Sequence, residues 1–248
     1  MGALQAHIRL SEDVGARCAL LAGDPARISR VAEHLEQVQE LAYNREYRSV
    51  CGIYKGVKIL ALSTGIGGAS MGIAVEELRN IGVEAAIRIG SAGSYQPHIG
   101  LGELILASGA VRDDGASRTY VPQAFPAVAD PELLQCCMEA AREYGAVHHT
   151  GIVRSHDSFY TDKEDEICAY WSGFGILGAD METSALYTIG KLRGLKAATI
   201  LNNVVLYQAD AGEGIDQYAS GDGLMAEGEK AEIVTALEAM VKWKARNG

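Results

Sequence analysis

The sequence predicts an α/β protein with a largely parallel or mixed central sheet. Short apolar runs of strand type alternate with amphipathic stretches along the 248 residues, and several of the runs end in glycine-containing turns. Strands joined by helical crossovers need both faces covered, so helices should flank the sheet. The chain has the length of one large α/β domain and lacks a linker or a composition shift, so we expect a single domain over 1–248.

The first half of the chain contains three strand-and-turn units. They are "RCALLAGDP" leading into the helical "ARISRVAEHLEQ", "VKILALSTGIGG" leading into the helical "MGIAVEELRNIG", and "EAAIRIGSAG" running into a third turn. Later strands are expected at "ELILASGAVRD", "TGIVRSHDSFY" and "KAATILNNVVLY", and later helices near 130–144, 182–193 and 226–245. The acidic, glycine-rich "QADAGEGIDQYASGDG" is the one long candidate loop. Ligands of open α/β sheets bind at the carboxyl ends of strands, so we expect the site at the glycine turns.

The composition excludes several classes of partner. A formal net charge of −10 and a pI near 5.1, with no Lys/Arg cluster, argue against binding of nucleic acid or of anionic membranes. The five cysteines form no CxxC pair, and their odd number makes a disulfide framework or a zinc ribbon unexpected. The N-terminus has no apolar signal-peptide core, and no 18-residue apolar stretch follows. We therefore expect a soluble protein of the reducing cytoplasm.

Arg88 raises the first question about function, because it is a permanent cation inside "EAAIRIGSAG", residues 84–93. In a strand that is buried on both faces, an unpaired charge costs several kcal/mol unless an anion meets it. Glu84, four positions earlier, is the only acidic residue nearby. Two interpretations are open: Arg88 snorkels at the strand end or pairs with a remote carboxylate, or it binds an anionic ligand.

A second arginine follows the glycine turn "AGDPAR". Gly23 and Asp24 stand at the strand exit, Pro25 is in the first helical turn, and Arg27 lies on that turn. Backbone N–H groups at a helix start, next to a guanidinium, can bind a small oxyanion; the alternative is a plain turn with a solvated arginine. Neither "AGDPAR" nor "STGIGGAS" is a Walker loop or a G-x-G-x-x-G motif. "IGSAG" does not match the nucleophile-elbow motif G-x-S-x-G, because Ile89 occupies the position of its first glycine. Dinucleotide binding and serine-hydrolase chemistry are therefore poorly supported.

Six motifs in order resemble those of the hexamer-forming nucleoside phosphorylase family, most closely its uridine phosphorylases. They are "GDPAR", "STGIGGAS", "AVEELRNIG", "RIGSAGSYQPHIGLGELI", "HDSFY" and "DMETSA". Each motif is weak alone, but their joint occurrence in this order, within residues 7–207, is specific. The resemblance implies a single domain of the nucleoside phosphorylase type, with a central mixed, partly barrel-like β-sheet flanked by helices.

The same resemblance identifies the missing anion as inorganic phosphate. The phosphate-binding residues that it implies are Gly23, Arg27, Arg45, Arg88 and Ser91. Arg45, in "NREY", would reach the phosphate from the neighbouring subunit; without the family context it reads as a surface arginine. Ser91 would donate a hydroxyl hydrogen bond.

The resemblance also implies a set of residues around the nucleoside. Met181 would pack on the sugar and Glu182 would accept hydrogen bonds from its hydroxyls, with Asp180 where a Glu is more usual. On local grounds alone, Glu182 is also explained as an acid at a helix N-terminus. Phe159 would stack on the nucleoside, and a buried core aromatic is the alternative. His7 would approach the ribose 5′-hydroxyl in the partner subunit's site.

The implied reaction is reversible phosphorolysis of a pyrimidine nucleoside, with uridine the expected substrate, giving free base and (deoxy)ribose 1-phosphate. Phosphate attacks the anomeric carbon through a transition state of oxocarbenium character. Arg88 and Glu182 are the expected catalytic residues, because they hold the dianion and the sugar without acid–base chemistry. No cofactor or metal is expected for catalysis. Glu46, Ile66 and Ser70 match positions that surround a structural monovalent cation, K⁺, at a subunit interface in the family.

The base-reading segment departs from the family pattern. In uridine phosphorylases of the best-known type, a Gln and an Arg follow the "FY" segment; here Lys163 and Asp165 stand there, and Lys163 is the candidate for binding the base. The hexameric purine enzymes have a proton-donating Asp after the late strand, where this chain has Val204 and Val205. A purine nucleoside phosphorylase, a hydrolytic nucleosidase and a catalytically silent nucleoside-binding protein remain alternatives, and ribose against deoxyribose stays open.

The expected partners are a nucleoside, inorganic phosphate and further copies of the chain. Family members form dimers in which each subunit completes the other's site, and three such dimers make a hexamer. We therefore expect at least a dimer and a hexamer as the full assembly, since His7 and Arg45 have no role otherwise.

Overall fold

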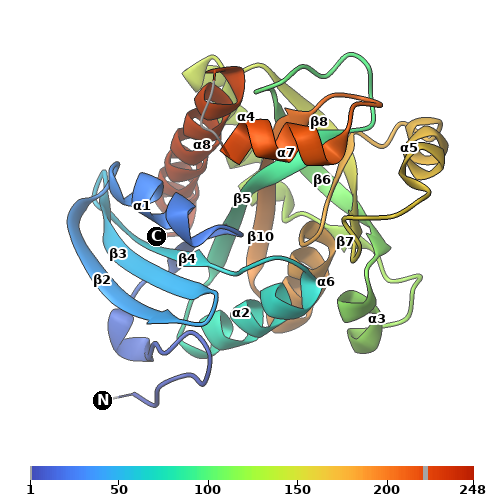
Figure 1. The fold of residues 1–248 in the computed structure, drawn as a ribbon. Helices are drawn as coiled ribbons and strands as arrows, with labels where there is room; N and C mark the ends of the chain where they lie inside the picture. Colours follow the sequence, from blue (N-terminus) through green and yellow to red (C-terminus); the bar gives the residue numbers. More distant parts are fainter. Residues whose placement is uncertain (1, 220–222) are drawn as a thin grey trace.

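The computed structural model describes residues 2–219 and 223–248, and Figure 1 shows them as a central sheet surrounded by helices. The strands are β1 (Cys18–Ala22), β2 (Glu36–Asn44), β3 (Tyr47–Tyr54), β4 (Val57–Ser63), β5 (Ala85–Ser94), β6 (Leu104–Asp113), β7 (Ala127–Val128), β8 (His148–His156), β9 (Gly178–Asp180) and β10 (Lys196–Val205). The helices are the 3₁₀ turn η1 (Glu12–Val14), α1 (Pro25–Ala32), α2 (Gly68–Asn80), α3 (Gly115–Tyr120), α4 (Pro131–Tyr144), α5 (Glu164–Ser172), α6 (Thr183–Arg193), α7 (Ala211–Ala219) and α8 (Gly223–Asn247).

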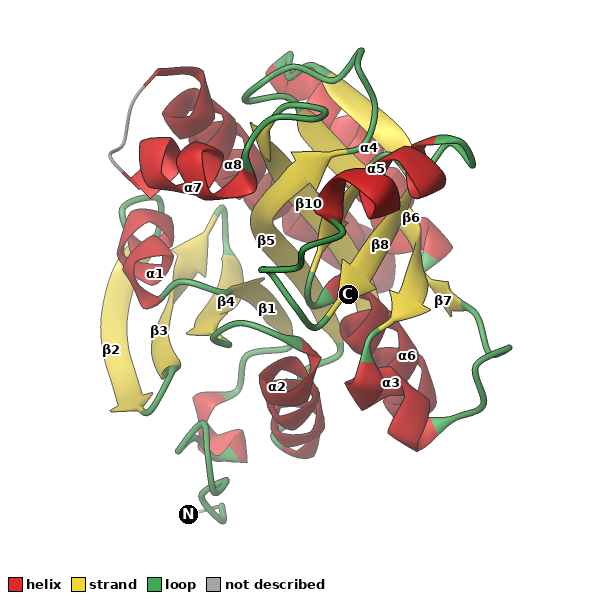
Figure 2. Cartoon of the chain, turned by 45° about the vertical axis from the view of Figure 1, so that its right-hand side comes forward, coloured by secondary structure: helices red, strands yellow, loops and turns green. Residues whose placement is uncertain are grey.

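The sheet is mixed, and part of it closes on itself. β5 pairs with β10 in parallel and with β9 in antiparallel fashion, while β10, β6, β8 and β9 follow one another, so these five strands form a ring. β1, β4, β3 and β2 extend the sheet from the other side of β5. Figure 2 shows β5 and β10 side by side within this ring. The expected α/β class with a mixed, partly barrel-like sheet is confirmed.

Two helical layers cover the sheet and give it two cores. On one side α1, α4 and α8 contribute apolar residues such as Ile28, Leu133 and Leu237. On the other side α2 and α6 contribute residues such as Met71 and Leu186. β5 is therefore buried on both faces, as the run of apolar residues around Arg88 predicts.

The first helix begins where the sequence predicts, but it ends early. Asp24 caps it by accepting a hydrogen bond from the Ala26 N–H at 2.8 Å, with Pro25 at its first position. The prediction of a helix through residue 37 is wrong, because Leu35 packs against Gly52 and the chain enters β2, which pairs with β3 in a hairpin. Tertiary pairing overrides the helical pattern of this segment.

Two other segments differ from the prediction. "IGSAG" is not a turn: β5 continues to Ser94, because Ser91 pairs with Asn202 of β10 and Gly93 pairs with Ala179 of β9. The expected loop over 208–223 contains α7, whereas positions 220–222 of it lie outside the described residues. The helices expected near 130–144, 182–193 and 226–245 are present as α4, α6 and α8.

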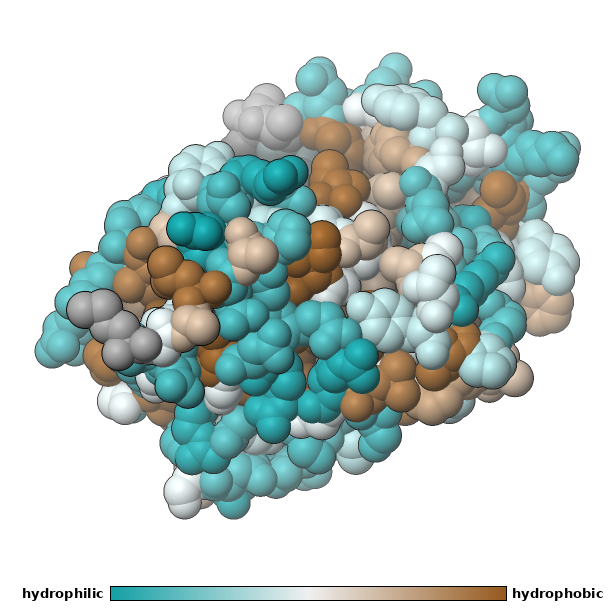
Figure 3. Space-filling model, turned by 90° about the horizontal axis from the view of Figure 1, so that it is seen from below, coloured by the Kyte–Doolittle hydropathy of each residue, from teal (hydrophilic) through white to brown (hydrophobic). Residues whose placement is uncertain are grey.

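The surface shows no single apolar belt on the face seen from below, where hydrophobic patches alternate with hydrophilic side chains (Figure 3). Among the described residues, no helix combines the length and the apolar character needed to cross a membrane.

Candidate functional site

Arg88 is held by two carboxylates that are remote in sequence. Its side chain is buried, with the residue 3% exposed. Nε donates to Asp180 Oδ2 at 3.0 Å, and Nη2 donates to Glu182. Glu84, the acidic neighbour in sequence, pairs instead with Arg17. Pairing with a remote carboxylate is thus one part of the answer to why a cation occupies this strand.

The other part is a donor that the protein leaves unused. Arg88 Nη1 is buried and has no hydrogen-bond partner within residues 2–219 and 223–248. Burial acts to lower the pKa of Arg88, but Glu182 and Asp180 outweigh it and the pKa is raised, so the guanidinium stays charged. A buried guanidinium with an unsatisfied N–H has room for one more hydrogen-bond acceptor, and an anionic ligand is one kind of group that supplies it.

Asp180 and Glu182 stand between the end of β9 and the start of α6. Both carboxylate oxygens of Asp180 accept hydrogen bonds within the protein. In addition to Arg88, the donors are Ser155 Oγ at 2.6 Å, Thr183 N at 3.0 Å and Thr183 Oγ1 at 2.6 Å. Glu182 accepts from the Gly67 N–H. Burial raises the pKa of Glu182 against the influence of Arg88, and the neighbouring Asp180 raises it further.

The first two glycine turns meet at the same edge of the sheet. Thr64 N donates to Ala22 O at 2.8 Å, which joins the carboxyl ends of β4 and β1. Gly67, with φ of 99°, turns its N–H toward Glu182, a conformation that favours glycine. A Cβ on Gly23 would lie 3.3 Å from Gly65 O, so a larger residue would be crowded there. The predicted convergence of the turns at the carboxyl edge is therefore observed for these two.

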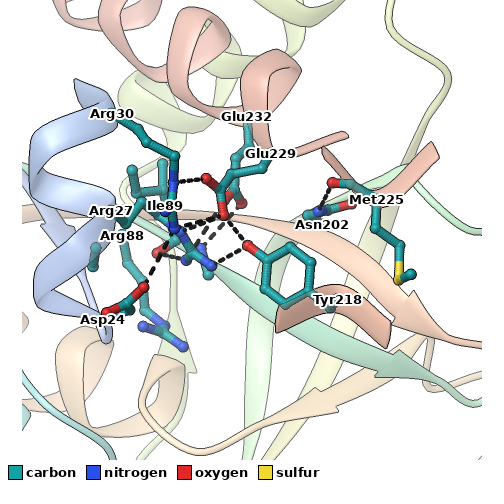
Figure 4. A network of polar contacts seen from close by, with 12 residues as sticks. Asp24, Arg27, Arg30, Arg88, Ile89, Asn202, Tyr218, Met225, Glu229 and Glu232 are labelled. Carbon is teal, nitrogen blue, oxygen red and sulfur yellow. Dashed lines mark hydrogen bonds and ion pairs between the residues drawn. The ribbon is translucent and has the colours of Figure 1, made fainter. Parts of the chain in front are cut away.

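Arg27 lies beside Arg88 but is anchored to the C-terminal part of the chain. It is buried, so the interpretation as a solvated arginine is wrong. Nη1 donates to Ile89 O at 3.2 Å, Nε donates to Glu229 Oε2 at 3.1 Å, and Nη2 donates to the Tyr218 hydroxyl. Figure 4 shows this network, in which Glu229 also pairs with Arg30. Burial acts to lower the pKa of Arg27, but its anionic neighbours outweigh that effect and raise it.

Glu232 completes the network from α8, where it is 0% exposed. Its Oε2 accepts the Gly90 N–H at 3.1 Å, and its Oε1 lies 3.5 Å from Arg27 Nη1. Sequence reasoning missed Tyr218, Glu229 and Glu232. A signal existed for the two glutamates, because they share the buried face of α8 with apolar residues such as Ile233, where a carboxylate needs a partner.

The expected nucleoside residues lie around this edge. Met181 is half-buried next to Glu182, and Ser91 is half-buried in β5. Phe159 follows β8 and is also half-buried, with its ring 4.9 Å from that of Tyr160, so it is not a core aromatic. Lys163 is exposed at the start of α5.

His7 and Arg45 form no hydrogen bond or ion pair with Arg27, Arg88 or Glu182 in the part of the chain that the structure describes. His7 Nδ1 is 2.7 Å from Glu77 Oε1 of α2, and His7 lines a cavity of about 580 Å³ between the N-terminal segment, α2 and α3. Arg45 is exposed at the turn between β2 and β3. The structure thus brings together Gly23, Arg27, Arg88 and Glu182 within one chain, but not His7 and Arg45.

The three residues of the expected cation site are near neighbours around the turn before α2. Ser70 Oγ donates to Ile66 O at 3.2 Å. Glu46 packs against Gly65, since a Cβ there would lie 2.8 Å from Glu46 Cγ. The Tyr47 hydroxyl donates to Ser70 O at 2.9 Å and so fixes the turn from the hairpin side.

Comparison with known proteins gives consistent matches. The family model described as the phosphorylase superfamily matches residues 17–231. The uridine phosphorylase of Thermococcus kodakarensis is 40% identical over 226 residues, which cover 85% of this chain and 82% of that protein.

Two solved structures are similar over nearly the whole chain. The crystal structure of uridine phosphorylase from Vibrio fischeri ES114 has 50% sequence identity and a TM-score of 0.91, covering 97% of this chain and 98% of that one. The purine nucleoside phosphorylase of Toxoplasma gondii, in complex with immucillin-H, has 31% identity and a TM-score of 0.87, covering 99% of both chains.

Proposed function

The chain belongs to the phosphorylase superfamily, and we propose that it is a pentosyltransferase that cleaves uridine by reversible phosphorolysis to uracil and ribose 1-phosphate. The uridine phosphorylases among its relatives support this substrate. The observation that carries the reaction type is the unused, buried Nη1 of Arg88 beside a second buried arginine, because a hydrolytic enzyme has no need of such an anion site.

The phosphate is bound by Arg88, Arg27, the backbone at Gly23 and the Ser91 hydroxyl. Arg88 offers a free N–H, and Gly23 directly follows β1 at the same edge of the sheet. The first turn of α1 adds no free N–H, because Pro25 has none and the Ala26 N–H is donated to Asp24. Asp180 and Glu182 hold the Arg88 guanidinium in place, which fixes the direction of that N–H.

Glu182 binds the ribose hydroxyls, and Met181 packs on the sugar. A phosphate oxygen forms a bond to the anomeric carbon while the glycosidic C–N bond breaks, and its electron pair leaves with the base, which takes a proton from solvent. Positive charge grows on the sugar ring during this step. The phosphate on one side and the Glu182 carboxylate on the other stabilise that charge, and the arginines keep the phosphate in line.

The base lies between Phe159 and the end of β10. Val204 and Val205 are buried there, and neither can donate a proton to a purine, which favours a pyrimidine. Phe159 is accessible for stacking, and Lys163 is an accessible donor for a uracil carbonyl. The likeness to a purine nucleoside phosphorylase supports purine cleavage as the second candidate.

The active assembly is a homo-oligomer, at least a dimer and in full a hexamer, in which the partner subunit supplies His7 and Arg45. The contacts of His7 with Glu77 rather than with the arginine cluster, and the exposure of Arg45, support a shared site. Glu46, Ile66 and Ser70 bind a structural K⁺ at the interface, and catalysis needs no cofactor. The cytoplasm, with its nucleoside and phosphate pools, is the compartment that fits this reaction.

The deciding experiment measures release of free base from uridine, thymidine and inosine by the purified protein, with and without inorganic phosphate. Phosphate-dependent release of uracil supports the proposal. Phosphate-dependent release of hypoxanthine alone keeps the mechanism and overturns the substrate. Release that does not depend on phosphate overturns the mechanism in favour of hydrolysis.

A further inference from the structure

Glu232 is a buried carboxyl group directly behind the proposed phosphate subsite. It accepts a hydrogen bond from the N–H of Gly90, the residue directly before Ser91 in β5, and it faces the guanidinium of Arg27. Figure 4 shows it reaching from α8 into the arginine cluster. None of the roles derived above uses this group.

The charges around the subsite are unfavourable for a dianion. Asp180 and Glu182 face Arg88. Two further carboxylates, those of Glu229 and Glu232, face Arg27. With Arg30 at the rim as a third cation, the carboxylates of these described residues outnumber the guanidiniums when all are ionised. A phosphate or sulfate dianion would add two negative charges to this buried region, where charges interact strongly.

The carboxylate best able to lose its charge is that of Glu232. Asp180 accepts hydrogen bonds from three residues, and Glu182 from two. Glu232 Oε1, in contrast, is buried and has no hydrogen-bond partner among the described residues.

The groups that face Glu232 come from four elements. Arg27 of α1 stabilises its charged form, as do Arg88 and the Gly90 N–H of β5. Glu229 of α8 destabilises the charged form of Glu232. The hydroxyl of Tyr218 of α7 accepts a hydrogen bond from Arg27 and donates one to Glu229. Burial is the largest influence and raises the pKa of Glu232 from 4.5 to about 8.

We propose that an oxyanion binds at Arg27 and Arg88 with Glu232 protonated, so that at alkaline pH Glu232 takes up a proton from solvent on binding and its ionisation controls the anion affinity of the site. This inference rests on the proposed phosphate subsite. Protonation removes one negative charge from behind the anion and releases Arg27 from one of its carboxylate partners. The affinity for the anion is then highest at a pH where Glu232 is already protonated in the free protein, and it falls above about pH 8.

The test is isothermal titration calorimetry with sulfate, whose charge does not change between pH 7 and 9, in two buffers of different ionisation enthalpy. In the wild-type protein at pH 8.5 we expect net proton uptake on binding, and a dissociation constant that rises up to about tenfold per pH unit above pH 8. In Glu232→Gln we expect no uptake and a dissociation constant that is flat with pH. Glu238→Gln is the matched control, since Glu238 is on the same helix but pairs with Tyr54 and Lys55.

The outcomes separate this inference from the function on which it rests. If sulfate and phosphate both fail to bind the wild-type protein, the proposed phosphate subsite is wrong and the inference falls with it. If the anions bind but Glu232→Gln takes up protons like the wild type, only the inference is overturned. Should the variant fail to fold, infrared difference spectra of the wild type decide: a protonated-carboxyl band must grow when sulfate is added at pH 8.5, and an unchanged band contradicts the proposal.

Discussion

Glu182 joins Arg88 to the second glycine turn, since one carboxylate oxygen accepts from the guanidinium and the other from the Gly67 N–H. A residue proposed for ribose binding therefore also orients a residue proposed for phosphate binding. The two substrates of a phosphorolysis must meet in line at one carbon, and a shared carboxylate ties the position of one binding group to that of the other.

Replacing Arg88 by Lys keeps the positive charge but removes the planar fork that contacts Asp180 and Glu182 at once. We expect kcat/KM for phosphate to fall by roughly 100-fold, a loss typical of one positioned charge-stabilising group. Steady-state kinetics at varied phosphate concentration measure this. Arg17→Lys, at the exposed pair with Glu84, should stay within about twofold of wild type. Phosphorolysis by Arg88→Ala within a few-fold of wild type would contradict an anion-binding role.

Replacing Glu182 by Gln removes the negative charge that faces the sugar while preserving shape. We expect kcat to fall by roughly 100-fold or more, because the charge acts mainly in the transition state. The raised pKa of Glu182 also places the acid limb of the wild-type pH–rate profile above the usual carboxylate range, and activity is lost as pH falls through that pKa. In Glu182→Gln the acid limb should be absent from the pH profile of kcat/KM. If the variant keeps an acid limb at the same pH, another group is responsible for the limb.

Much of the fold was predictable, because its signals are local. The alternation of apolar runs with helical patterns identified β1, β4, β5, α2, α4 and α6, and capping chemistry at Asp24 and Pro25 located the start of α1. The β2–β3 hairpin was not predictable in this way. Its first strand, β2, is largely exposed, so it lacks the alternation that marks a half-buried strand.

Only those residues of the candidate site that stand in a recognisable sequence motif were predictable. Arg27, Arg88 and Glu182 stand in motifs, and their convergence depends on strand ends that meet at one edge of the sheet. The partners of Arg27 are about 190 to 200 positions away in sequence, on α7 and α8. Only tertiary structure reveals such a pairing, although an acidic residue on the apolar face of α8 signals that some cation must meet it.

Tyr218→Phe tests how Arg27 is held. The hydroxyl accepts from Arg27 and donates to Glu229, so its removal frees the guanidinium from one restraint without changing any charge. We expect the KM for phosphate to rise several-fold with kcat within about twofold, and stability to fall by about 1 kcal/mol. Tyr54→Phe is the control, because its hydroxyl bonds Glu238 on the same helix. It should lower the free energy of unfolding similarly and leave the phosphate KM unchanged. Equal KM values for both variants would show that Tyr218 does not orient Arg27.

Glu232 should also make the stability of the ligand-free protein depend on pH. Its folded-state pKa, about 8, lies above the ordinary 4.5, so the folded protein holds the proton more tightly than the unfolded chain. That contribution is fully present below pH 4.5 and is lost as pH rises through about 8, at no more than about 1.4 kcal/mol per pH unit. The free energies of unfolding of Glu232→Gln and of the wild type are measured by urea titrations at pH 6 to 9. The difference, variant minus wild type, should therefore increase as pH rises. Parallel curves for the two proteins would exclude a raised pKa.

The shared site makes a prediction about mixed oligomers. If Arg45 acts in the partner's site while Arg88 acts in its own, Arg45→Ala and Arg88→Ala should each be nearly inactive alone. A dimer that contains one subunit of each kind then has one site with both arginines intact and one site with neither. Random reassembly of the two variants should restore about a quarter of wild-type activity, because half of the dimers are mixed and each has one intact site of two. Activity that stays at the level of the separate variants, measured after exchange is verified by mass spectrometry, would place both arginines in the same subunit's site or leave Arg45 outside it.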